Sequence, residues 1–206
     1  MSSTPAMPDP RLLYARATAQ LATVVTTVRP ERLDAPTPCT EYDVRSLLGH
    51  LVGAMRRIAA VPGGGDGKGA DVPEWTAEVP AGEWPELFED GRMRMIEAWA
   101  DDALMETVVT VPWGRVPGRM ALAGSVMETA AHTWDLARAL GWSGPLDEEV
   151  GRFALGVAQQ AVPAAGREQL PFGEVREALA GADGYGQLAA WLGRDPEWRA
   201  PDAAAR

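Results

Sequence analysis

The sequence predicts an all-α protein built on a four-helix bundle. Several long segments repeat apolar residues every three or four positions, which is the period of an amphipathic helix. One short run, Val108–Val111, has the β-branched composition of a strand, and long connections rich in Pro and Gly separate the helical segments. The 206 residues fit one domain with a small appendage. We expect the bundle in residues 1–142 and a short, mainly helical C-terminal extension packed on it in residues 143–206.

The first helix is expected to begin at Asp9-Pro10, because Asp can cap a helix and Pro fits its first turn. It should end before Pro30. An apolar stripe over about four turns supports this helix: Leu13, Ala17, Leu21, Val24 and Val28.

The second helix is expected over about residues 42–60. Thr40 and Asp43 have the spacing of a capping box, which places the helix start near Thr40. Cys39 lies just ahead of this start, where a reactive thiol is conceivable. A small buried residue under the loop is the favoured interpretation, since free Cys is among the most buried residue types.

The third helix is expected over residues 84–102. The glycine-rich segment Pro62–Asp71 before it is expected to be a flexible surface insertion, with a lid as the alternative. After the run Val108–Val111, the segment Pro112–Gly118 is expected to form an ordered loop that leads into the next helix. That helix carries Met127–Gly141, which is apolar over most of its circumference and should be buried.

Two further helices are expected in the C-terminal extension. The first starts near 145–147 and is broken at Pro163, and the second covers about residues 185–192 and ends at Gly193.

The two histidines of the chain, His50 and His132, mark a candidate metal site. Glu128 precedes His132 by four residues, so both side chains lie on the same face of a helix. Both histidines lie in apolar helical segments, where an unpartnered imidazole would be costly. We therefore hypothesise that His50, Glu128 and His132 hold one divalent metal. The alternative is that Glu128 and His132 belong to a solvated helix face.

Three other side chains are candidates for roles around this site. Asp135, one turn beyond His132, could orient His132 or an outer water. Trp113 and Arg115 lie in the segment that enters the same helix, where a loop can contact a substrate.

The composition excludes several classes of partner. The net charge of −10 would repel nucleic acid and anionic membranes. No window approaches the ~18 apolar residues of a membrane span, and Met1–Asp9 lacks the pattern of a signal peptide. The single Cys39 excludes an internal disulfide and agrees with a cytoplasmic location. We expect a monomer or homodimer acting on a small molecule, whose anionic group Arg56 or Arg57 could bind.

Five motifs, spread over nearly the whole chain, carry a resemblance to a known family: Thr37-Pro-Cys-Thr, Leu47-Leu-Gly-His-Leu, Val111-Pro-Trp-Gly, Glu128–Gly141 and Leu192–Trp198. With these motifs the sequence resembles the DinB-like metal-binding superfamily. Within it, the chain is similar to the branch that includes the N-terminal domain of mycothiol-dependent maleylpyruvate isomerase, and to an actinobacterial group of metal-binding proteins.

The resemblance implies a DinB-like four-helix bundle in which His50, Glu128 and His132 bind a divalent metal between helices. The metal is expected to be zinc, with nickel, iron or manganese as alternatives, and the co-substrate to be mycothiol or another small thiol. The implied activity is a thiol-dependent transferase or isomerase acting on a small electrophile. The isomerase has a second domain that helps to form its active site, whereas only residues 142–206 follow here, so maleylpyruvate itself is not the expected substrate. Alternatives are a non-catalytic metal-binding or ligand-sensing module, a metal-dependent hydrolase and a specialised biosynthetic enzyme.

Overall fold

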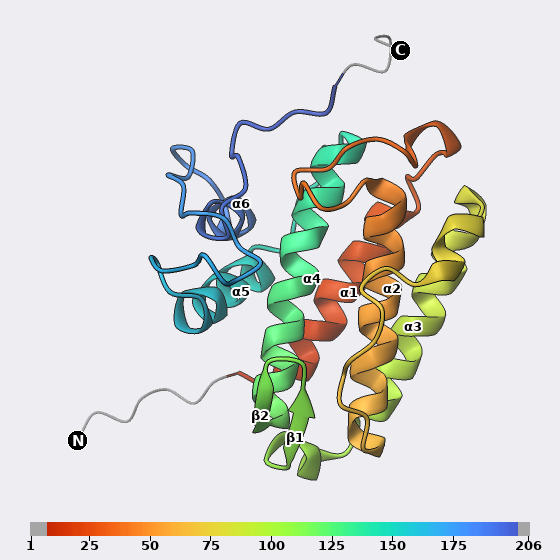
Figure 1. The fold of residues 1–206 in the computed structure, drawn as a ribbon, viewed down its shortest axis with the longest axis vertical. Helices are drawn as coiled ribbons and strands as arrows, with labels where there is room; N and C mark the ends of the chain where they lie inside the picture. The colour runs from red at the N-terminus through yellow and green to blue at the C-terminus, as the bar shows by residue number, and fades with distance from the viewer. Residues whose placement is uncertain (1–7, 202–206) are drawn as a thin grey trace.

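The computed structural model describes residues 8–201, which form six α-helices and one two-stranded antiparallel sheet (Figure 1). The helices are α1 Pro10–Val25, α2 Val44–Ala60, α3 Trp84–Ala98, α4 Gly118–Leu140, α5 Glu148–Ala161 and α6 Gly184–Trp191, and the strands are β1 Val108–Val111 and β2 Gly114–Pro117. The predicted, mainly helical fold is therefore confirmed, with a small sheet added to it.

The first four helices lie side by side, and each contacts two others of the set (Figure 1). Helix α1 contacts α3 and α4, and α2 contacts the same two helices. The longest helix, α4, also contacts α5 and α6 on its other side. Helix α4 therefore lies between the first three helices and the C-terminal pair.

The predicted N-terminal cap of α1 is confirmed, because the Asp9 carboxylate accepts a hydrogen bond from the backbone N–H of Arg11 at 3.0 Å. Helix α2 begins at Val44, two residues after the predicted start at about residue 42, but the predicted cap at Thr40 is wrong. Asp43 caps this helix by accepting from the backbone N–H of Ser46 at 2.8 Å. Thr40 lies in a turn that an antiparallel bridge between Pro36 and Asp43 closes, so it is not in position to cap.

The predicted loop Pro112–Gly118 is also wrong, because its second half is strand β2. Val109 pairs with Val116, and Val111 pairs with Gly114 across a turn at Pro112 and Trp113. Gly114 has a φ of 140°, a backbone conformation that residues other than glycine rarely adopt. The hairpin packs at one end of α4 and leads directly into it (Figure 1).

Helix α3 ends at Ala98, earlier than predicted. The next residue, Trp99, is buried, and its indole N–H donates to the carbonyl of Ile58 in α2 at 2.9 Å. This contact satisfies the indole N–H inside the protein.

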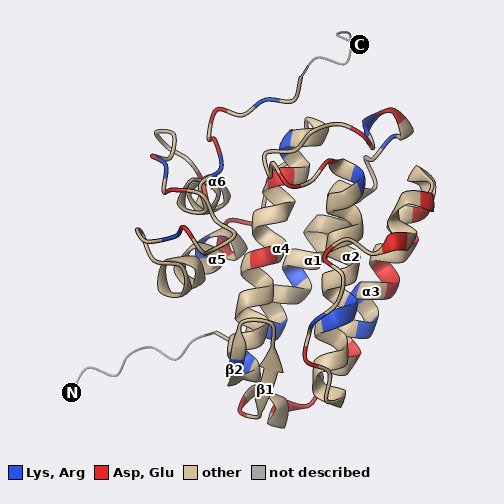
Figure 2. Ribbon diagram, viewed as in Figure 1, with Lys and Arg blue, Asp and Glu red and all other residues tan. Residues whose placement is uncertain are grey.

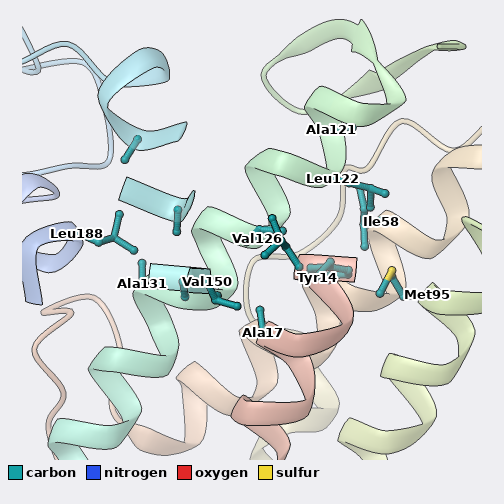
Figure 3. Packing of buried hydrophobic residues seen from close by; sticks show 14 of the residues in the cluster. Tyr14, Ala17, Ile58, Met95, Ala121, Leu122, Val126, Ala131, Val150 and Leu188 are labelled. Atoms are coloured by element: carbon teal, nitrogen blue, oxygen red, sulfur yellow. The ribbon is translucent and has the colours of Figure 1, made fainter. Parts of the chain in front are cut away.

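One hydrophobic core joins the bundle to the C-terminal helices. Tyr14 and Ala17 of α1, Val126 of α4, Val150 of α5 and Leu188 of α6 belong to the same cluster of buried residues (Figure 3). Burial of such side chains against each other is the main favourable term for this packing.

Charged residues are scattered along the helices and the loops, with several of both signs on α3 (Figure 2). On α3, Arg92 and Arg94 form ion pairs with Glu89 and Asp90, each within one helical turn. No helix in residues 8–201 combines the length and the hydropathy that crossing a membrane would require.

Candidate metal centre

The three side chains predicted to bind a metal lie next to one another between α2 and α4. Nε2 of His50 is 3.1 Å from Oε1 of Glu128, and the ring centroids of His50 and His132 are 5.1 Å apart. Both histidines are buried, while the side chain of Glu128 is 31% exposed. The group is therefore enclosed by the two helices and reaches solvent beside Glu128.

The imidazole of His132 is held by a buried carboxylate. Its Nδ1 lies 2.9 Å from Oδ2 of Asp135, whose side chain is fully buried. Arg194 binds the same carboxylate, with Nε 3.1 Å from Oδ1 and Nη2 3.1 Å from Oδ2. Burial alone would raise the pKa of Asp135, but the hydrogen bond with His132 and the positive charge of Arg194 outweigh burial and lower it. An ionised Asp135 keeps the proton on Nδ1 of His132 and leaves the lone pair on Nε2.

The imidazole of His50 has a corresponding carboxylate, from Asp71. Nδ1 of His50 lies 2.9 Å from Oδ1 of Asp71, and the hydroxyl of Tyr42 donates to Oδ2 of Asp71. The Tyr42 ring stacks on the His50 ring with centroids 4.9 Å apart. Burial lowers the pKa of His50, but the hydrogen bond and the charge of Glu128 raise it by more.

Sequence reasoning did not find Asp71 or Tyr42. The sequence favours a plain surface insertion for the segment Pro62–Asp71, with a lid as the alternative, and neither prediction identifies its last residue as a contact of a candidate ligand. No short motif marks this Asp, since the contact depends on how the segment folds back over α2. Helical periodicity does not mark Tyr42 either, because Tyr42 precedes the first residue of α2.

The donor set of His50, Glu128 and His132 fits a divalent metal in its chemistry. Two imidazoles and one carboxylate are ligands of catalytic zinc sites that keep a position open. Each imidazole also has a carboxylate at Nδ1, the arrangement that fixes the tautomer of a metal-binding histidine.

Among the described residues, a different trio has all its donor atoms within 4.8 Å of one another: Cys39, His132 and Asp135. In that trio, Asp135 is already bound by Arg194, and burial raises the pKa of the Cys39 thiol to about 11. Cys39 is therefore protonated and a poor ligand near neutral pH. The donor atoms of His50, Glu128 and His132 do not all lie within 4.8 Å of one another, so these side chains must move closer together to bind one ion.

The remaining candidates lie around this group or away from it. The exposed indole of Trp113 lies against Gly124 of α4, because a Cβ added to Gly124 would be 3.0 Å from the ring. Gly124 is one turn before Glu128. Arg115 is exposed on β2. The arginines of α2 contact the connection to α3: Arg56 lies over the ring of Trp75 at 5.0 Å, and Arg57 donates to the carbonyl of Ala70 at 2.8 Å.

Residues 14–137 match the family described as the mycothiol maleylpyruvate isomerase N-terminal domain. The chain belongs to this family. Two uncharacterised proteins of Mycobacterium tuberculosis, from strains H37Rv and CDC 1551, are each 29% identical to it over 187 residues. These alignments cover 90% of this chain and 98% of each relative. The predicted family and its actinobacterial branch are therefore confirmed.

Two crystal structures of mycothiol-dependent maleylpyruvate isomerase, one of them a histidine-to-alanine mutant, share the fold with TM-scores of 0.57 and 0.58. Both are 14% identical to this chain, and the superpositions cover 66% and 76% of it. They cover 63% of the first isomerase chain and 70% of the mutant chain, so this protein matches less than two thirds of the first. At this level of identity the likeness concerns the fold alone.

Proposed function

We propose that this member of the family is a metal-dependent enzyme that activates a small thiol, mycothiol being the first candidate, for transfer to or isomerisation of a small electrophile. The observation that carries the proposal is the pairing of each imidazole with a carboxylate at Nδ1, beside the carboxylate of Glu128. A buried histidine with only a packing role needs a hydrogen-bond partner, but that partner need not be a carboxylate. Here a carboxylate lies at Nδ1 of both histidines, as is typical of metal-binding histidines. Membership of a family named for a mycothiol-dependent isomerase supports the choice of thiol.

In this proposal, His50, Glu128 and His132 hold one divalent metal, for which zinc is the first candidate. A metal of this kind, when bound, supplies a Lewis acid that favours the ionised form of a thiol or water beside it. Asp135 keeps the proton of His132 on Nδ1, so that Nε2 faces the site as a donor atom. The exposure of Glu128 gives a small molecule access.

Two residues of the hairpin, Trp113 and Arg115, would bind the electrophile. The exposed indole of Trp113, resting one turn from Glu128, offers an apolar surface, and the guanidinium of Arg115 can attract an anionic group. We also propose that residues 1–142 form a DinB-like four-helix bundle and that residues 143–206 are its extension. The contacts of α1 to α4 with one another support this division.

A non-catalytic metal-binding module is the second candidate. The low exposure of both histidines, 6% for His50 and 8% for His132, favours it, since a structural metal site is closed to solvent.

Elemental analysis combined with a thiol-transfer assay tests the proposal. We expect wild type to hold about one equivalent of metal per chain and to conjugate mycothiol to small electrophiles. His132→Ala and Glu128→Ala should lose both properties and keep their helical circular dichroism. Glu97→Ala, at an exposed position of α3, is the matched control and should keep both.

Three results would count against a catalytic site. Wild type without metal after growth in metal-supplemented medium would remove the proposal altogether. Bound metal without thiol transfer, together with a large loss of melting temperature on chelation, would favour the non-catalytic module. Metal-dependent hydrolysis in place of thiol transfer would show that water is the activated group.

A further inference from the structure

Asp71 is an exposed residue of the connection between α2 and α3, and it contacts both His50 and Tyr42. Its Oδ1 lies 2.9 Å and its main-chain oxygen 3.3 Å from Nδ1 of His50, and its Oδ2 accepts the hydroxyl of Tyr42. Tyr42 in turn stacks on the His50 ring. Asp71 therefore holds the ring of His50 at its edge, while Tyr42 holds it at its face.

The glycine-rich segment that ends at Asp71 follows a defined path over α2 to the hairpin. Arg57 of α2 donates to the carbonyl of Ala70 at 2.8 Å, and an added Cβ on Gly69 would lie 3.1 Å from Cδ of Arg57. Gly67, with a φ of 69°, lies so near the hairpin turn that an added Cβ would be 2.9 Å from the ring of Pro112. The connection between α2 and α3 crosses in front of α2 in Figure 1.

The two histidines are supported unequally. Asp135 is on the same helix as His132, is fully buried and is bound by Arg194. Asp71 comes from a glycine-rich connection, and its side chain is 64% exposed. Water competes with an exposed hydrogen bond, so the support of His50 can be lost at little cost to the rest of the fold.

We infer that Asp71 is a positioning residue for His50, through which the segment 62–71 sets the state of the proposed site. A carboxylate faces each ring nitrogen of His50, Asp71 at Nδ1 and Glu128 at Nε2, so the two compete for the ring proton. A metal at Nε2 requires the proton on Nδ1, where Asp71 accepts it. Without the Asp71 contact, His50 would lose both the acceptor for a proton on Nδ1 and the contact that fixes the edge of its ring. This inference rests on the proposed function, but the tautomer of His50 can be measured without a metal.

The first test uses the metal-free protein. The chain has two histidines, so nitrogen NMR of the imidazoles gives two sets of signals, which the His50→Ala variant assigns. At a pH where both rings are neutral, Asp71 and Glu128 compete for the His50 proton, and the fraction on Nδ1 should be larger in wild type than in Asp71→Ala. Asp71→Ala should shift His50 toward the Nε2–H form, whose proton Glu128 accepts and which a free histidine side chain also favours, and leave His132 unchanged. Asp71→Asn, which can both donate and accept, should give an Nδ1–H fraction between those of wild type and Asp71→Ala.

The second test measures zinc binding by competition with a chelating dye. Asp71→Ala should weaken binding about 10-fold or more, in line with the loss of other outer partners of metal-binding histidines. Asp66→Asn is the matched control, because Asp66 lies on the same segment and contacts Lys68 instead of His50. It should change neither zinc binding nor the tautomer.

The outcomes separate this inference from the proposed function. An unchanged His50 tautomer and unchanged zinc affinity in Asp71→Ala would overturn the inference while leaving the metal site intact. If wild type binds no zinc, the proposed function fails, and the tautomer of His50 still decides whether Asp71 positions it. A loss of tautomeric preference in Asp66→Asn as well would show that the whole segment, and not Asp71, controls the ring.

Discussion

Replacing Arg194 by leucine should destabilise the protein strongly, although Arg194 lies after the last helix. Its guanidinium makes two hydrogen bonds of 3.1 Å to the carboxylate of Asp135, which is fully buried in α4. Leucine removes this partner and leaves Asp135 with the hydrogen bond from His132 alone. A buried carboxylate that loses its counter-charge cannot recover the lost interaction from water.

The expected loss of unfolding free energy follows from this geometry. Removing one partner of a buried ion pair costs about 3–5 kcal/mol. His132 still satisfies one oxygen of Asp135, so the lower end, about 3 kcal/mol, is the expected value. For a chain of this length each kcal/mol shifts the melting temperature by about 2–4 °C, so the variant should melt about 6–12 °C lower.

Urea and thermal unfolding, followed by circular dichroism, measure this loss. Arg152→Leu is the control, because Arg152 forms an exposed pair with Glu148 one turn away, and it should change stability by no more than about 0.5 kcal/mol. Combining Arg194→Leu with Asp135→Asn should cost less than the sum of the single variants, by at least about 1 kcal/mol, because the pair is coupled. A cost for Arg194→Leu no larger than that of Arg152→Leu, with no coupling in the cycle, would refute the reasoning.

Three further outcomes are expected. Burial raises the pKa of Cys39 to about 11, against about 8.5 for a free thiol, so iodoacetamide at pH 8 should modify the native protein at least about 100-fold more slowly than the urea-unfolded chain. The sign of this shift also means that stability falls above about pH 8.5, where the unfolded thiol ionises and the folded one does not; equal alkylation rates would contradict both statements. Gly49→Ala should cost about 1–3 kcal/mol in urea unfolding, because its Cβ would lie 2.1 Å from Oγ1 of the buried Thr76, and Thr76→Ala should restore part of this loss. Gly141→Ala should lower the unfolding free energy by about 1 kcal/mol, because Gly141 ends α4 with a φ of 70°. Gly156→Ala inside α5, where an added Cβ has open space, should be neutral or stabilising. Similar effects of the two substitutions would argue against the left-handed cap.

The features that the sequence predicted correctly are local ones. Leu13, Ala17 and Leu21 recur with the period of a helix and line the buried side of α1. Asp9 caps α1, and Gly193 follows the end of α6, through contacts within a single turn. The proximity of Glu128 and His132 also follows from the geometry of one helix. Such features depend on residues fewer than about five positions apart, so they can be read from a single chain.

The tertiary structure decided which distant groups complete the site. The contacts of His50 with Asp71 and of Asp135 with Arg194 join residues 21 and 59 positions apart, and neither pair belongs to a periodic pattern. The hairpin was missed for a related reason, because β2 is a strand only through its pairing with β1. The sequence by itself determined the helices and named three candidate ligands, since propensity, capping and periodicity act within a few residues. Only the packed chain determined what holds those ligands, because a buried histidine is oriented by whichever carboxylate the fold brings to its Nδ1.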